Sequence, residues 1–276
     1  MKSKIFKNKK RPLIMGIVNV TPDSFYDGGK YIDPAVAVER AADMAVSGAD
    51  ILDVGGESTR PGAKEVDIEL EKKRVLPVIE AIRAAGIKLP VSVDTTKAEL
   101  AEQALEAGAN IINDVSALRF DERMAAVVSE NDAELVLMHM QGRPRDMQEN
   151  PRYDDLIGEI ILFLKQRIEF AESAGISREK IIVDPGIGFG KNLKHNREIF
   201  SKINRFSELD VSVLVGHSRK SYLGEVLNRP AEERLVGTLA TSAYLQFKEV
   251  DIIRVHDVKE HVELRKTINW LKSGSG

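Results

Sequence analysis

Eight short apolar runs in this sequence carry, or end at, a polar side chain that could take part in chemistry. The runs are residues 13–18, 51–54, 91–93, 111–113, 135–138, 181–183, 213–216 and 252–255. Their polar residues are Asn19, Asp53, Asp94, Asp114, His139, Asp184, His217 and His256. Amides, carboxylates and imidazoles exchange hydrogen bonds, and some of them protons, with a ligand. A fold that gathers the ends of these runs would therefore create a binding or catalytic site.

The apolar runs are typical of strands that are buried on both faces, as in parallel sheets. Helical periodicity between most of them indicates repeated βα units. Eight such units can close into a (β/α)8 TIM barrel, in which all the strands end at one rim. We therefore predict a (β/α)8 TIM barrel with the polar residues collected at that rim.

The remaining segments predict the helices that would surround the barrel. The first covers residues 34–47, with Asp33 as its N-cap, and the others cover residues 67–85, 97–107, 122–130, 154–174, 193–204, 233–247 and 258–271. The loops after the first, second and fifth strands are long and rich in Gly and Pro, as functional loops often are. No linker divides the chain. We expect one domain over residues 1–276, with a basic tail at 1–11 and a flexible end at 272–276.

Composition narrows the class of protein. The chain has 276 residues, 30% of them charged, and a formal net charge of −3, so neither nucleic acid nor an anionic membrane is an expected partner. The absence of cysteine excludes disulfides, thiolate metal sites and a cysteine nucleophile. No apolar stretch is long enough to span a bilayer. We expect a cytoplasmic enzyme.

The segment 181–191, IIVDPGIGFGK, resembles a phosphate-binding loop without meeting its requirements. Pro185 stands where a P-loop needs glycine, and Asn192 replaces its Ser or Thr. Two interpretations stay open. The segment is a tight βα turn capped by Asp184, or it presents the Asp184 carboxylate beside the aromatic ring of Phe189.

The segment 216–221, GHSRKS, lacks the second glycine that a nucleophile elbow requires. Ser218, Arg219 and Lys220 form either a solvated loop or an anion-binding cluster at the start of a helix. Arg254 and His256 lie two residues apart and so share one face of the last strand. An inward arginine needs an anionic or stacking partner, which favours a site over a structural salt bridge.

The other histidines are weaker candidates. His139 is expected to orient a loop, while His195 and His261 lie in helical patterns and are expected at the surface. No HxH or HExxH pair exists, so a preformed zinc site is not expected. The candidate residues offer hydrogen bonds and anion binding but no activated nucleophile. A bound substrate, rather than a covalent enzyme intermediate, is the expected mode of catalysis.

Eight segments together resemble the dihydropteroate synthase family. They are MGIVNVTPDSFYDGG, DVGGESTRPGA, VSVDTTK, INDVSA, MHMQG, DPGIGFGK, GHSRKS and IRVHDV, and they run from Met15 to Val258 in the family's order. The resemblance implies a (β/α)8 barrel that is usually homodimeric. It implies joining of 4-aminobenzoate to (7,8-dihydropterin-6-yl)methyl diphosphate, with release of pyrophosphate and assistance from Mg²⁺.

The resemblance also assigns residues, position by position. The implied pterin contacts are Asp94, Asn113, Asp184, Lys220 and Arg254, with the Arg254 guanidinium stacked on the ring. The implied diphosphate contacts are Asn19, Arg254 and His256, and Asn19 is also the implied Mg²⁺ ligand. The implied 4-aminobenzoate pocket and its closing loops contain Phe25, Thr59, Arg60, Pro61, Phe189 and Ser218. The implied catalytic residues are Asp94, Lys220, Arg254 and His256.

The family's mechanism is dissociative: diphosphate leaves first, and the amine attacks the resulting pterin-methyl cation. Two residues depart from the family pattern, Arg143 where a small residue is frequent and Tyr26 where Ser is frequent, and both lie in loops. The nearest alternative is a pterin-dependent methyltransferase with the same fold, against which the TRPGA and SRKS segments argue. A catalytically silent pterin- or phosphate-binding barrel is a second alternative.

Overall fold

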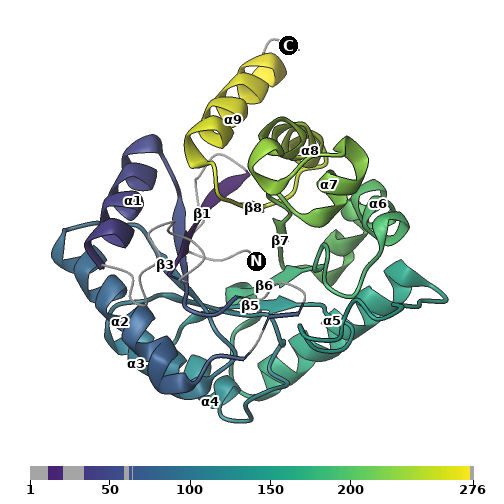
Figure 1. The fold of residues 1–276 in the computed structure, drawn as a ribbon. Coiled ribbons are helices and arrows are strands. Elements are labelled where there is room, and N and C mark those ends of the chain that lie inside the picture. The colour runs from purple at the N-terminus through teal and green to yellow at the C-terminus, as the bar shows by residue number, and fades with distance from the viewer. Residues whose placement is uncertain (1–11, 21–33, 59–61, 64, 274–276) are drawn as a thin grey trace.

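Eight parallel strands form a closed barrel at the centre of the protein. The computed structural model describes residues 12–20, 34–58, 62–63 and 65–273. The strands hydrogen-bond in sequence order, and the last pairs with the first (Figure 1). They are β1 (Leu13–Asn19), β2 (Ile51–Gly55), β3 (Val91–Asp94), β4 (Ile111–Asp114), β5 (Glu134–Met138), β6 (Ile181–Asp184), β7 (Ser212–Gly216) and β8 (Ile252–Val255). The predicted (β/α)8 barrel is confirmed.

Helices surround the barrel and follow the predicted pattern with a few differences. They are α1 (Pro34–Ser47), α2 (Ile68–Ala84), α3 (Ala98–Glu106), α4 (Met124–Glu130), α5 (Leu156–Ser173), α6 (Leu193–Ser201), α7 (Ser221–Leu227), α8 (Leu235–Phe247) and α9 (Val258–Ser273). Short 3-10 segments lie at Arg178–Lys180, Ile203–Leu209 and Ala231–Glu233. The Asp33 cap predicted for α1 lies outside the described residues.

Three helix predictions need correction. Helix α7 was not given a predicted range, although the start of a helix after Lys220 was one of the two interpretations of the segment 216–221. Helix α6 ends at Ser201, and a 3-10 segment follows it, whereas one helix to residue 204 was predicted. Helix α9 continues to Ser273, so residues 272 and 273 are helical and do not belong to a flexible end.

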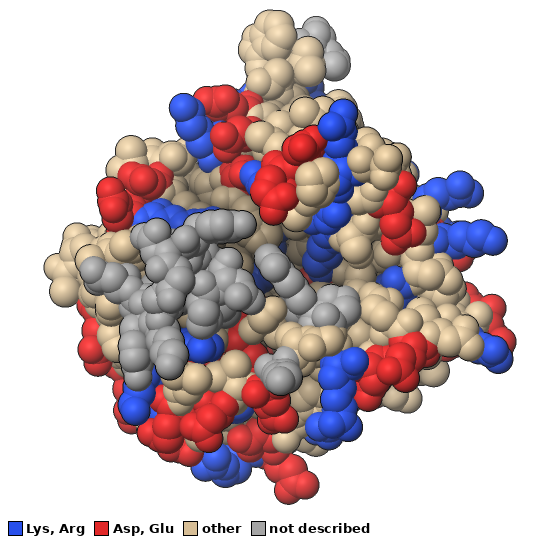
Figure 2. Space-filling view, in the orientation of Figure 1, with Lys and Arg blue, Asp and Glu red and all other residues tan. Residues whose placement is uncertain are grey.

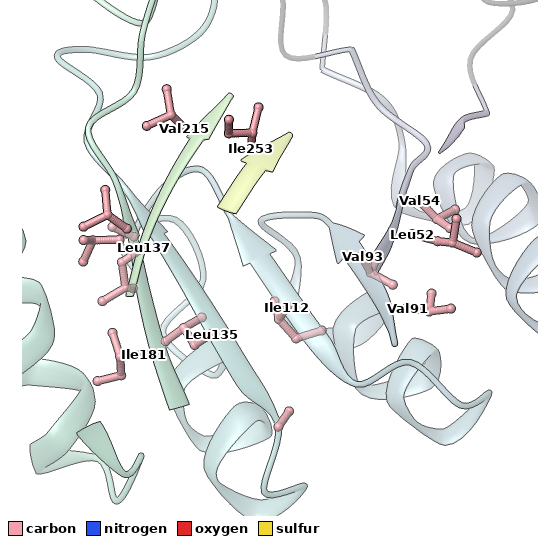
Figure 3. Close-up of a cluster of buried hydrophobic side chains, with 14 of the residues drawn as sticks. Leu52, Val54, Val91, Val93, Ile112, Leu135, Leu137, Ile181, Val215 and Ile253 are labelled. Carbon is pink, nitrogen blue, oxygen red and sulfur yellow. The ribbon is translucent and has the colours of Figure 1, made fainter. Parts of the chain in front are cut away.

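Successive side chains along each strand point to opposite faces, and they form two hydrophobic clusters, one outside the barrel and one inside it. Side chains that face outward pack against the helices, and Figure 3 shows ten of them labelled, among them Leu52, Val93 and Ile253. Their inward-facing neighbours form a separate layer inside the barrel: Leu13, Met15, Ile51, Ile111, Val136, Ile182, Leu214 and Ile252. Two residues beyond that layer, β2, β4, β6 and β8 turn Asp53, Asn113, Asp184 and Arg254 inward at the rim. The barrel therefore aims the rim residues at a common point.

The prediction for His261 was wrong. His261 was expected at the surface, but it is only 1% exposed, because α9 packs against α8 and α1 and buries the face that carries this ring. No helix within the described ranges is long and apolar enough to cross a membrane.

Candidate active site

Arg254 is the centre of the inward-facing layer at the rim. Its Nε donates to Oδ2 of Asp53 at 2.6 Å, and its Nη2 donates to Oδ2 of Asp94 at 2.9 Å. Asn113 lies beside this group, with its amide nitrogen 3.4 Å from Asp53 Oδ2. These residues come from β8, β2, β3 and β4, and inward alternation alone brings them together. The anionic partner that an inward arginine needs is therefore present twice.

The ionisation of this group follows from its burial. Burial raises the pKa of Asp94 to about 7, against the opposing effect of Arg254 and with support from the negative charge of Asp53. Burial alone would lower the pKa of Arg254, but Asp53 and Asp94 together raise it. Arg254 is therefore a permanent cation, whereas Asp94 can gain or lose a proton near neutrality.

Asp184 and Lys220 face this group from the other side of the barrel. Asp184 Oδ1 accepts a hydrogen bond from the Gly186 amide at 2.7 Å, and burial raises the pKa of its carboxyl despite the nearby Lys220. Burial lowers the pKa of Lys220 to about 8, with the Asp184 charge opposing the change. The Lys220 ammonium lies 4.4 Å from the centre of the Phe189 ring and donates to the carbonyl of Ile187. A carboxylate, an amine and an aromatic wall thus border one space.

A cavity of about 710 Å³ opens over Asp94, Lys220 and Arg254, whereas Asp53, Asn113 and Asp184 lie behind them and are not part of its lining. Its lining includes Asn19, Arg40, Asp94, Phe189, Ser218, Lys220, Arg254 and His256. Figure 2 shows a hollow near the centre of this face, with Lys and Arg as well as Asp and Glu atoms along its edge. Concave sites of this size with a few converging polar groups are typical of small-molecule binding.

Around His256 the mouth of the cavity carries more cations than anions, although Glu57, Glu232 and Asp257 also line the cavity. Arg40 on α1 joins Arg254 there, and both lower the pKa of His256, which burial brings to about 3. The neutral ring of His256 contacts Ser218, with Nδ1 3.0 Å from the hydroxyl oxygen. An incoming anion would offset the arginine charges and raise this pKa. The geometry suits a phosphate or diphosphate group.

For the segment 218–220, a solvated loop and an anion-binding cluster were both open interpretations, and two of its side chains already have partners within the protein. Arg219 is paired with Asp257, at 2.9 Å through Nε and 2.6 Å through Nη2, so most of its charge is already neutralised. Ser218 lies against His256 instead of standing free. Arg40 was missed by sequence reasoning, because an isolated arginine in the first helix carries no motif.

Outward-facing polar residues support the rim instead of lining it. Asp114 accepts from the amides of Ser116 and Leu118 at 2.8 and 2.7 Å and so fixes the turn after β4. His217 Nε2 lies 3.0 Å from the Ser242 hydroxyl, on the helix side of β7. Burial lowers the pKa of His217 to about 3, so the ring stays neutral. The prediction that Asn113 and Asp114 face opposite sides of their strand is confirmed.

Four predicted site residues lie outside the described residues: Phe25, Thr59, Arg60 and Pro61. The unusual residue Arg143 is described, and its guanidinium lies 4.8 Å from the centre of the Phe120 ring. The loops after β2 and β5 meet nearby, where the Gly62 amide donates to the Pro144 carbonyl at 3.2 Å. Arg143 therefore packs on a loop beside the main cavity.

Comparison with known proteins decides the family. The family described as pterin binding enzyme matches residues 15–256. The dihydropteroate synthase of Escherichia coli K12 is 47% identical over 93% of this chain and 90% of its own length. The chain belongs to the dihydropteroate synthase family. It is thereby a transferase, and the methyltransferase alternative is not favoured.

Solved structures of the family agree in fold. The Yersinia pestis dihydropteroate synthase, determined as a complex with a sulfonamide drug, has a TM-score of 0.91, 42% identity and 95% coverage of both chains. The Xanthomonas albilineans enzyme in complex with 7,8-dihydropteroate has a TM-score of 0.85 and 40% identity over 95% of this chain and 94% of its own. The rim described above belongs to this shared barrel.

Proposed function

We propose that this chain joins (7,8-dihydropterin-6-yl)methyl diphosphate to 4-aminobenzoate, giving 7,8-dihydropteroate and pyrophosphate. The observation that carries the proposal is the pair of carboxylates held by Arg254 at the base of a cavity whose mouth is cationic. A flat, polar ring fits the base, and an anionic tail fits the mouth.

The deep part of the cavity suits the pterin ring. Asp184 can accept from the 2-amino and N3–H edge of a pterin, and Lys220 can donate to its acceptor atoms. Asn113 and Asp94 border the same slot, and the guanidinium of Arg254 offers a flat face for stacking. A pterin analogue that left one of these buried groups without a hydrogen bond would lose about 1–3 kcal/mol of binding.

The cationic mouth suits the leaving diphosphate. Arg40 supplies a positive charge from α1, and Arg254, whose own charge is offset by Asp53 and Asp94, borders the same space. His256 adds a hydrogen bond, and its pKa would rise beside the anion until the ring also carries charge. Groups that stabilise charge as it develops on a leaving group lower the barrier to its departure.

Mg²⁺ belongs to this proposal, and the residues present fit it. No cluster of three or more His, Asp or Glu side chains suited to a metal occurs within the described ranges. Mg²⁺ commonly keeps several waters and binds through substrate phosphates with one or two protein oxygens. Asn19, at the cavity wall, can supply one amide oxygen. When bound with the diphosphate, the ion would neutralise part of its charge.

The reaction needs no strong base on the protein. The bond from the pterin methylene carbon to oxygen breaks first, and its electron pair leaves with the diphosphate. The aromatic amine then forms the new carbon–nitrogen bond and releases one proton. The carboxylate of Asp94 can stabilise the transient cation, which explains why no activated nucleophile stands at the rim.

The second substrate is assigned to the outer part of the cavity. Phe189 offers an aromatic face, and Ser218 lies at the same wall. The proposed pocket also includes Phe25, Thr59, Arg60 and Pro61, as the family resemblance implies. A cytoplasmic location and a homodimer belong to the same proposal.

Pyrophosphate release from the purified protein tests the function. With the pterin diphosphate, 4-aminobenzoate and Mg²⁺ present, we expect pyrophosphate and dihydropteroate in equal amounts. Pyrophosphate release should require both 4-aminobenzoate and Mg²⁺. Pyrophosphate release without formation of dihydropteroate would contradict the proposal.

A further inference from the structure

The loop between β6 and α6, residues 185–192, carries the aromatic wall of the site. We name it the carbonyl loop, because its backbone carbonyl groups at 187–190 each accept a hydrogen bond from a side chain. The donors, in that order, are Lys220, Gln148, Lys191 and Tyr153. Lys220 already has a place in the proposed reaction. Lys191 has no place in that reaction, although its side chain is almost completely buried between the carbonyl loop and the end of β5.

Lys191 is only 2% exposed and makes three close polar contacts. Its Nζ lies 2.8 Å from the Phe189 carbonyl oxygen, 2.9 Å from His139 Nδ1 and 3.3 Å from the His139 carbonyl oxygen. Burial lowers the pKa of Lys191 well below its usual value, against the opposing charge of Asp184, and these contacts are what hold the buried amine in place. A lysine is seldom fully buried unless it is paired. Its position therefore calls for a specific role.

His139 anchors the other end of this contact at the end of β5. Its backbone amide donates to the Asp184 carbonyl at 2.9 Å, and its ring packs edge-on against Phe163 at 5.0 Å. Burial, together with the charges of Lys191 and Arg119, lowers the pKa of His139 to about 2. The ring is therefore neutral, and a neutral imidazole has one nitrogen free to accept a hydrogen bond.

The result of these contacts is a fixed orientation for Phe189. Its carbonyl is held by Lys191, and the carbonyl of Ile187, two residues earlier, is held by Lys220. The ring is 8% exposed and lies at the wall of the main cavity, beneath the Lys220 ammonium. A shift of about 1 Å in a positioning group can cost about 100-fold in rate.

We propose that Lys191 and His139 form a clamp that positions Phe189 for the second substrate. The proposal rests on the function given above, in which Phe189 faces 4-aminobenzoate. Lys191 is a positioning residue in this scheme and touches no substrate. The clamp acts on the backbone at Phe189, whereas Asp94 and Arg254 belong to β3 and β8, so it should influence the two substrates unequally.

Lys191→Met tests the clamp, because Met has a similar length and cannot make the three polar contacts. We expect the KM for 4-aminobenzoate to rise about tenfold, the change that accompanies the loss of one net hydrogen bond. The KM for the pterin diphosphate should stay within about twofold, and kcat should change less than the first KM. Lys194→Met is the matched control, because Lys194 is exposed on α6 three residues away.

Amide hydrogen exchange supplies a readout that does not depend on the reaction. In Lys191→Met, residues 185–192 should exchange faster than in the unsubstituted protein, while β2 and β3 stay equally protected. Should the unsubstituted protein form no dihydropteroate, the proposed function fails, whereas the exchange comparison still decides whether the clamp exists.

A pair of substitutions at His139 provides the rescue experiment and serves if Lys191→Met does not fold. His139→Leu removes the ring acceptor and should reproduce the rise in the KM for 4-aminobenzoate. His139→Asn keeps an oxygen that can accept from Lys191 and should restore most of the affinity. An equal rise in both KM values, or unchanged kinetics and exchange in Lys191→Met, would overturn the clamp.

Discussion

Burial brings the pKa values of one carboxyl and one amine at the rim close to each other, which is unusual for these groups. Burial raises the pKa of Asp94 to about 7, and burial lowers the pKa of Lys220 to about 8. Their proposed roles need opposite charges, a carboxylate that stabilises a cation and an ammonium that donates to the pterin. Both requirements are met together only in a narrow pH range between the two values.

The pH dependence of kcat/KM should therefore be bell-shaped. It should rise as pH increases through about 7, where Asp94 loses its proton, and fall above about 8, where Lys220 loses its own. In Lys220→Arg the falling limb should move to higher pH, because guanidinium stays protonated. Lys194→Arg, at an exposed position, is the control. A falling limb that stays in place in Lys220→Arg would exclude Lys220 as its origin.

Some of the residues at the rim could be predicted from the sequence, and others could not. Asp94 and Asp184 were found because each ends an apolar run, Arg254 because it shares a face of its strand with His256, and Asn113 through the resemblance to the dihydropteroate synthase family. The ion pair between Arg254 and Asp53 joins residues 201 positions apart, and only closure of the barrel brings them together. Arg40 was missed because its role depends on the direction in which α1 leaves the barrel.

At the scale of elements, the carbonyl loop after β6 packs closely against the backbone at the end of β5. Gly186 has a φ of +70°, and a Cβ at this position would collide with the carbonyl oxygen of His139. Glycine is therefore required twice here, for the backbone conformation and for the close approach of the two loops. The glycine-rich motif is visible in the sequence. The backbone that packs against Gly186 is not, because it comes from the end of β5.

Gly186→Ala should destabilise the protein more than Gly86→Ala. Gly86 has a similar φ of +75°, but no atom lies within 4 Å of the place that a Cβ would take there, so it isolates the conformational cost. That cost is about 1–2 kcal/mol in the free energy of unfolding. Overpacking should add about 1–3 kcal/mol in Gly186→Ala alone. Urea denaturation followed by circular dichroism measures both, and equal midpoints would refute the packing argument.

At the scale of the whole molecule, one side of the helical ring is unusually apolar. Helices α7, α8 and α9 lie side by side, and the end of α9 extends beyond the barrel (Figure 1). Their exposed large hydrophobic residues are Val226, Leu227, Val236, Tyr244, Phe247, Trp270 and Leu271. Such a patch is typical of a protein–protein interface. It supports the proposed homodimer and gives it a location.

Val236→Glu should convert the dimer into a monomer. Val236 is 78% exposed on α8, and a carboxylate there would be buried without a partner in the dimer. Light scattering should give twice the chain mass of 30.6 kDa for the unsubstituted protein and the single mass for the variant. Leu162→Glu, 57% exposed on α5, is the control and should remain dimeric. A single-chain mass for the unsubstituted protein would contradict the proposed dimer.

The contrast between the paired base of the cavity and its cationic mouth has a consequence for ionic strength. Arg254 meets Asp53 and Asp94 at 2.6 and 2.9 Å in a buried setting, where dissolved ions screen charges only weakly. The charges at the mouth lie nearer to solvent, and a Debye length of about 10 Å at 0.1 M salt is enough to weaken them. Added salt should therefore loosen the diphosphate end of the substrate and leave its ring in place. The same pterin without its diphosphate should bind with an affinity that hardly changes with salt.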